Sequence, residues 1–262
     1  MTEYSGPNVT ASPLDVTTLT AADIAVLSAS LHAAARSAEH RQAAAEAIVA
    51  TLFASLKDAS GEPACVLTRC FQTCSYARLP LQYRDAADDL LERTPSHANM
   101  RCLALLATRG VRTVWNDVAT STNHQCIPLP SVEVVRRAPM VAGLLQQIGF
   151  SVDQVVTSPS DFDHVLHKPR TDSTNSSIFH VENAVESPLI PAQNEFVKPF
   201  KVRSVIGFGD ILPDGEIFAV LLFLRTPVSA PIASAFNHLA ASATAILQRF
   251  PPRQTFQPLN CP

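Results

Sequence analysis

The pattern of apolar and polar positions is most regular over residues 202–229, where two apolar runs flank the segment LPDGEI. Both runs are rich in β-branched and aromatic residues, which favour strands. Between the runs, Pro213 fixes φ, Asp214 can bond the backbone, and Gly215 accepts a positive φ. We therefore predict a β-hairpin. Its second strand is expected to be buried on both faces, because residues 217–223 are apolar almost continuously.

Apolar stripes at alternating spacings of three and four residues run near both ends of the chain. The N-terminal stripe follows the capping-box-like sequence TAAD and consists of Ile24, Leu27, Leu31, Ala34, Ala38, Ile48, Leu52 and Leu56. The C-terminal stripe consists of Ile232, Phe236, Leu239, Ala243, Ile246 and Phe250. These stripes predict long amphipathic N- and C-terminal helices, which lie on their own sheet or form the seam of a dimer.

Between these helices, the pattern predicts a mostly antiparallel sheet. Strands are expected at 63–71, 100–110, 111–115 and 178–182, a short extended piece at 124–129, and helices at 81–93 and 138–150. Residues 157–177 are polar and rich in Ser, Thr and Asp, which predicts a loop or lid. Helices at both ends of such a sheet indicate an α+β fold. The expected organisation is a flexible tail over 1–19, one domain over 20–250 and a proline-rich tail over 251–262.

Composition narrows the function classes. The 262 residues are 47% hydrophobic and 16% charged, enough to bury a substantial core. A net charge of −3 gives no footprint for nucleic acid or for an acidic membrane. No apolar run approaches the roughly 20 residues that span a bilayer, and the N-terminus does not resemble a signal peptide. We expect a cytoplasmic protein whose six cysteines are thiols, with no nucleic-acid or membrane partner.

The last third resembles the end of a GAF domain, in which an apolar strand, a D-G turn, a second apolar strand and a closing helix follow in this order. The segments CLALLATRGVRTVWND, STNHQCIPLPS, APMVAGLLQQIG and IFHVENAVESPLIPAQNEF are similar to GAF-like sensor regions found upstream of bacterial histidine kinases and related signalling outputs. The resemblance spans roughly residues 20–250. It implies a GAF/PAS-like central antiparallel sheet flanked by helices.

Function is also implied by this resemblance. GAF-like modules are cytosolic sensors that bind a small molecule, are often homodimeric through their terminal helices, and signal to a histidine kinase of a two-component system or to another output. No reaction is implied, so we expect a non-enzymatic protein of signal transduction. The identity of the ligand, or of any cofactor, stays open.

Candidate ligand-binding residues are aromatic or polar positions in or beside the expected strands. Trp115, Asn116 and His124 lie at a strand end and in the loop after it, where an aromatic plate with an amide and an imidazole suits a small polar or aromatic ligand. His180 interrupts an apolar strand, and Phe208 lies between two glycines, which mark a close approach of another group. The alternative is that these side chains belong to the core or cap loop backbone.

Cys65, Cys70 and Cys74 lie within ten residues of one another. On a regular strand, Cys65 and Cys70 would point to opposite faces, and the spacing lacks the C-x-x-C pairs of a zinc site. Buried thiols are the favoured interpretation, and neither a catalytic residue nor a metal site is expected. One alternative is a redox or metal-binding enzyme or sensor that uses these cysteines. Another is a scaffold protein whose pocket is filled by its own side chains.

Overall fold

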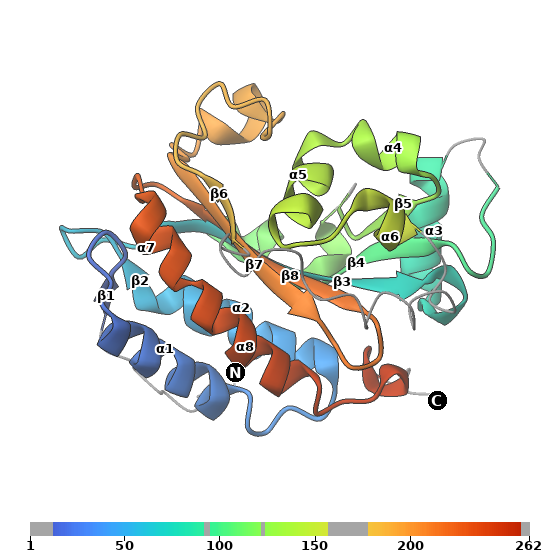
Figure 1. The fold of residues 1–262 in the computed structure, drawn as a ribbon, viewed down its shortest axis with the longest axis horizontal. Coiled ribbons are helices and arrows are strands. Elements are labelled where there is room, and N and C mark those ends of the chain that lie inside the picture. Colours follow the sequence, from blue (N-terminus) through green and yellow to red (C-terminus); the bar gives the residue numbers. More distant parts are fainter. Residues whose placement is uncertain (1–12, 92–94, 122–123, 157–177, 258–262) are drawn as a thin grey trace, which may run out of the picture.

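The structure is a computed structural model that describes residues 13–91, 95–121, 124–156 and 178–257. The loop or lid expected at 157–177 lies outside these ranges. Six strands form one antiparallel sheet in the order β5-β4-β3-β8-β7-β6, and helices lie on both of its faces (Figure 1). The prediction of an α+β fold with a central antiparallel sheet flanked by helices is therefore confirmed.

The strands of the sheet are β3 (Cys65–Ser75), β4 (Arg101–Gly110), β5 (Cys126–Leu129), β6 (Ile178–Val181), β7 (Ser204–Ile211) and β8 (Ile217–Leu224). A separate parallel pair joins β1 (Leu14–Asp15) to β2 (Leu56–Lys57). The central strands are β3 and β8, which pair with each other and bring the first and last strands of the sheet side by side.

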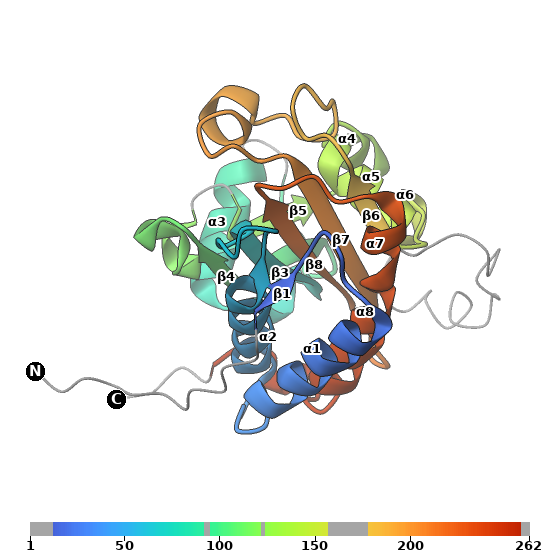
Figure 2. The same ribbon diagram turned by 90° about the vertical axis from the view of Figure 1, so that its left-hand side faces the viewer.

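Two helical layers enclose the sheet (Figures 1 and 2). The first face is covered by α1 (Ala21–Ala34), α2 (Arg41–Ser55), α3 (Leu81–Leu91), α7 (Ala230–Ala235) and α8 (Asn237–Leu247). The second face is covered by α4 (Val132–Arg136), α5 (Pro139–Gln147), α6 (Val152–Val156) and a π-helical turn, η5 (Gln193–Val197). Each face has its own apolar core.

The expected hairpin is β7 and β8, paired in register from Ser204 opposite Leu224 to Ile211 opposite Ile217. All eight residues of β8 are buried, as predicted, because the strand lies at the centre of the sheet with a helical layer on each side. Gly215 has φ of 79°, the left-handed conformation that the turn requires.

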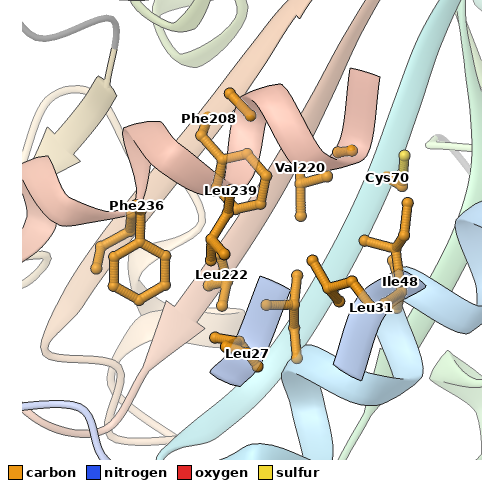
Figure 3. Close-up of a cluster of buried hydrophobic side chains, with 14 of the residues drawn as sticks. Leu27, Leu31, Ile48, Cys70, Phe208, Val220, Leu222, Phe236 and Leu239 are labelled. Carbon is orange, nitrogen blue, oxygen red and sulfur yellow. The ribbon is translucent and has the colours of Figure 1, made fainter. Parts of the chain in front are cut away.

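Both apolar stripes point inward. Figure 3 shows Leu27 and Leu31 of α1, Ile48 of α2 and Leu239 of α8 directed onto the first face of the sheet, where Phe208, Val220 and Leu222 of β7 and β8 meet them. Burying this many apolar side chains stabilises the layer by about 1.5–3 kcal/mol for each large one. Because the side chains of both stripes pack within one chain, the stripes do not form a dimer seam. A homodimer would need another surface.

Several boundaries differ from those expected. The N-terminal stripe divides into α1 and α2, and the C-terminal stripe divides into α7 and α8 at Phe236. Residues 111–115 do not form a strand. They lead into a 3₁₀ turn, η2 (Thr113–Trp115), which folds back over the end of β4. Within the described parts of the two expected tails, Leu14 and Val16 are buried, and the Thr255 carbonyl accepts from the Gln42 N–H at 2.8 Å.

Side chains cap the N-terminal ends of α1 and α2. The capping box at α1 is present: the Thr20 hydroxyl accepts from the Asp23 N–H at 3.2 Å, and the Asp23 carboxylate accepts from the Thr20 N–H at 2.9 Å. The Thr20 hydroxyl also donates to the Asp23 carboxylate at 2.7 Å, and this bond, together with the one from the Thr20 N–H, lowers the pKa of Asp23. At α2, the cap is a histidine: His40 Nδ1 accepts from the Ala43 N–H at 3.1 Å. An imidazole can accept at Nδ1 only while that nitrogen carries no proton.

We predict that the His40 cap makes stability depend on pH. Burial lowers the pKa of His40 from its usual 6.5. Because the folded pKa is the lower one, the stabilisation is complete above the unfolded pKa and is lost as the pH falls through the folded pKa. His40→Asn can cap without titrating. The melting temperature of the wild type should therefore fall more between about pH 7 and pH 5 than that of the variant. Equal losses would contradict this role.

We also predict that Gly215→Val destabilises the protein by about 1–3 kcal/mol. No atom lies within 4 Å of an ideal Cβ at this position, so the cost comes from the positive φ alone. Gly215→Asn is the matched control, because asparagine tolerates this conformation. Urea unfolding should rank wild type, Asn and Val in decreasing stability. A valine variant as stable as wild type would show that the turn does not need glycine.

Candidate functional site

Two of the arginines that the structure describes are fully buried, and each is neutralised by the β7–β8 turn. Arg41 is 1% exposed; its Nη2 pairs with the Asp214 carboxylate at 2.8 Å, and its Nη1 donates to Gln72 Oε1 at 3.2 Å. It also donates to the carbonyls of Leu247 and Phe250. These bonds join the start of α2 to the end of α8, where free carbonyls favour a cation.

Arg101 is the second, with 0% exposure. Its Nη2 pairs with Glu216 Oε2 at 2.9 Å and donates to the Gly215 carbonyl at 2.9 Å. Glu216 also accepts from Arg78 Nη1 at 3.2 Å and from the Thr73 hydroxyl at 2.7 Å. Asp214 was expected only to turn the hairpin, and that is wrong: both carboxylates of the turn neutralise buried guanidinium groups.

A hollow of about 240 Å³ adjoins the Arg41 pair. Its lining consists of Arg41, Pro213, Asp214, Gln248, Phe250, Pro251 and Pro252. Each guanidinium nitrogen of Arg41 already binds a group of the chain. We therefore assign Arg41 a structural role and look for a ligand site elsewhere.

Arg69 of β3 differs from both. Its register partners Thr108 and Leu221 place it in the row that crosses the second face at the centre of the sheet. The side chain is partly exposed, but its Nε is buried without a hydrogen-bond partner. Within the part of the chain that the structure describes, no carboxylate forms an ion pair with it.

The burial of the Arg69 guanidinium is unfavourable in free energy. Burial lowers the pKa of the Arg69 guanidinium to about 10, and no acid within the described ranges opposes that shift. A charge in such surroundings is normally paired, because a charge removed from water without a partner loses several kcal/mol. At neutral pH the group is still protonated, so it presents a desolvated positive charge and donors that no described acceptor uses.

An aromatic cluster lies beside this row: Trp115, Phe196 and Phe200 are partly exposed, and they pack with the buried Phe223. The hydroxyl of Thr108, the neighbour of Arg69, donates to the Trp115 carbonyl at 2.9 Å. The Trp115 ring centre lies 4.6 Å from that of Phe200. A Cβ added to Gly110 would lie 2.8 Å from the indole, so glycine lets the ring pack against the sheet.

The structure does not bring the five predicted ligand residues together. Trp115 lies on the second face, whereas Phe208 is fully buried on the first face, with its ring 6.4 Å from that of Phe236. His180 also faces the first layer, where its Nε2 lies 2.8 Å from the Val228 carbonyl. The role of Phe208 and His180 in ligand binding stays a prediction. Neither can contact the same small molecule as Trp115, because they lie on the opposite face of the sheet.

The other two lie at the surface. Asn116 is exposed, and its side-chain oxygen accepts from the Gly110 N–H at 2.8 Å, which caps the end of β4. His124 is exposed in the loop before β5. Of the five, only Trp115 adjoins Arg69. Sequence reasoning missed Arg69, although the available signal was a charged residue inside an apolar strand at 63–71.

The described cysteines are divided between two apolar clusters. Cys65 and Cys70 lie on the same face, contrary to expectation, because a bulge between Cys65 and Leu67 shifts the alternation. Burial raises the pKa of Cys65 and Cys70 to about 12, which keeps them as thiols. Cys74 packs with two further cysteines under α3. No group of three or more His, Cys, Asp or Glu side chains in the described ranges could hold a metal ion.

Comparisons with known proteins identify no family. No protein-family model and no curated protein matches the chain. A solved structure of the N-acylhomoserine lactone-dependent LuxR-family transcription factor CepR2 from Burkholderia cenocepacia is similar, with 15% identity over 87% of this chain and 95% of that chain and a TM-score of 0.35. A likeness at that level carries no argument about this chain.

The resemblance to a GAF domain is wrong on these findings. No protein-family model, that of the GAF domain included, matches the chain. The histidine-kinase and two-component association that rested on that resemblance is withdrawn with it. Over the described ranges, the helices are all too short or too polar to cross a membrane.

We predict that Glu216→Gln destabilises the protein by about 3–5 kcal/mol, because it removes the carboxylate from buried Arg101. The control is Arg136→Gln, which breaks a surface pair with Asp153 in which the arginine side chain is 61% exposed. That change should stay within about 0.5 kcal/mol. Chemical denaturation measures both. Similar small losses would show that the turn network is not what holds the hairpin.

Proposed function

We propose that the chain is a non-enzymatic small-molecule-binding module with a regulatory role, and that its ligand brings negative charge to Arg69 on the second face of the sheet. The single observation that carries this proposal is the desolvated guanidinium of Arg69 without a described counter-charge. Such perturbed, unpaired groups are concentrated at functional sites, where the destabilisation they cause is retained because binding relieves it.

The comparison with Arg41 and Arg101 supports this assignment. Both are more deeply buried than Arg69, and both have carboxylates at 2.8–2.9 Å. The chain thus pairs its structural guanidinium groups internally. Arg69 is also the one of the three that is partly exposed, so an anion can reach it from solvent.

Binding is favoured over catalysis by the chemistry of the side chain. A guanidinium whose pKa is lowered only to about 10 keeps its proton near neutral pH, so it fixes charge rather than transfers protons. The thiols, with pKa values raised by burial, present little thiolate for nucleophilic attack. Free thiols agree with the proposed reducing, cytoplasmic setting. A signalling partner is part of the proposal, without a named output.

We predict that Arg69→Met stabilises the ligand-free protein by about 1 kcal/mol or more, because methionine fills similar space without a desolvated charge. The same change should abolish retention of any co-purified small anion in native mass spectrometry. Unfolding is measured by urea after exhaustive dialysis. Arg36→Met is the matched control: it removes an exposed charge that forms no ion pair within the described ranges and should change stability by under about 0.5 kcal/mol.

The opposite sign contradicts the proposal. If Arg69→Met costs about 3–5 kcal/mol, the guanidinium has a partner within the folded chain and is structural. The scaffold alternative, in which the chain fills its own pocket, then becomes the better account. A stabilised variant together with loss of a bound anion from the wild type supports a ligand site.

A further inference from the structure

The form of the Arg69 site points to one class of ligand, an inference that rests on the proposed function. Its first determinant is the amount of charge. Neither of two other described arginines supplies such a charge: Arg101 is paired with Glu216, and Arg112 is exposed to solvent with its guanidinium 5.8 Å from the centre of the Trp115 ring. This leaves Arg69 as the desolvated charge available to a ligand. Its neighbours in the same row, Leu221 and Gly207, are uncharged. One positive charge balances a monoanion and leaves a phosphate dianion with excess charge in poorly solvated surroundings.

The second determinant is geometry. The unpartnered atom is Nε, the nitrogen nearest the main chain, and it is buried. An acceptor that satisfies it must enter along the edge of the guanidinium that carries Nε and one Nη. That edge presents two parallel N–H groups, which match the two oxygens of a planar carboxylate.

The third determinant is the apolar surface around the charge. Leu67 and Phe71, two residues away on either side in β3, lie on the same face and are buried. Beside them, the aromatic rings of Trp115, Phe196 and Phe200 are only partly buried. Partly exposed rings next to a desolvated cation suit a molecule with an apolar body and a charged end.

We infer that the site binds an organic monocarboxylate, with its carboxylate on the Nε edge of Arg69 and its apolar body against the aromatic cluster. The chain contains one tryptophan, Trp115, so its fluorescence reports directly on occupancy of this region. No covalent step is involved.

The test compares acids with their uncharged amides. Phenylacetate and octanoate at millimolar concentration are titrated against dialysed protein, alongside phenylacetamide, octanamide and inorganic phosphate, using Trp115 fluorescence and calorimetry. Each acid should bind wild type at least about tenfold more tightly than its amide, which corresponds to about 1.4 kcal/mol. Arg69→Met should remove this difference. Arg69→Lys should restore only part of it, because an ammonium has no fork.

Phe200→Ala separates the two halves of the site. It should weaken an acid and its amide by a similar factor, about three- to tenfold, since the ring contacts the body rather than the charge. Circular dichroism and urea unfolding confirm that the variant folds. If Phe200→Ala leaves both affinities unchanged, the body does not lie on the aromatic cluster and the inference is wrong.

The remaining outcomes distinguish this inference from the proposed function. Phosphate binding as tight as that of the acids, and dependent on Arg69, overturns the monocarboxylate class but leaves an anion site. Equal binding of acids and amides, or no binding of either acid, also overturns it. When Arg69→Met is at the same time stabilising, the anion site stands with another ligand. When Arg69→Met is destabilising by several kcal/mol, the proposed function fails as well.

Discussion

The cost of removing a guanidinium from water organises this molecule. Arg41 and Arg101 lie inside it, and their compensation by Asp214 and Glu216 ties the central hairpin to α2 on one side and to β4 on the other. The turn therefore works as a junction, since losing either carboxylate would leave a buried charge rather than merely loosen a loop. Arg69 is subject to the same cost, but no residue that the structure describes forms an ion pair with it, and this exception is the basis of the proposed function.

The two faces of the sheet have different characters. The first face is closed by the inward stripes of α1, α2 and α8, whose side chains fill the layer down to Phe208 and Val220 (Figure 3). The second face has an apolar core too, but it also carries a cation without a described counter-charge and partly exposed aromatic rings. A site of this kind sits on a rigid support, because Arg69 belongs to the strand at the centre of the sheet.

Local features could be predicted from the sequence, and features that depend on distant contacts could not. The Pro-Asp-Gly turn, the Thr20 capping box and the apolar stripes are set within a few residues, and each is present. The direction of the stripes is not local, so a dimer seam and an internal layer were equally open. The bulge after Cys65 reset the alternation of β3, and the packing of Trp115 over Gly110 turned an expected strand into a 3₁₀ turn.

The hairpin followed by a helix is also too general a pattern to identify a family, which is why the GAF resemblance failed. In the sequence, Arg69 is a charged residue within an apolar strand. Only the folded structure shows that no described acid forms an ion pair with it.

The most direct test of the central claim is a crystal structure of the wild-type protein, purified without denaturation and without added carboxylates. The account predicts a bound anion with an oxygen atom within about 3 Å of Arg69 Nε. A carboxylate of the chain itself in that position would contradict it, because Arg69 would then be a third internally paired arginine.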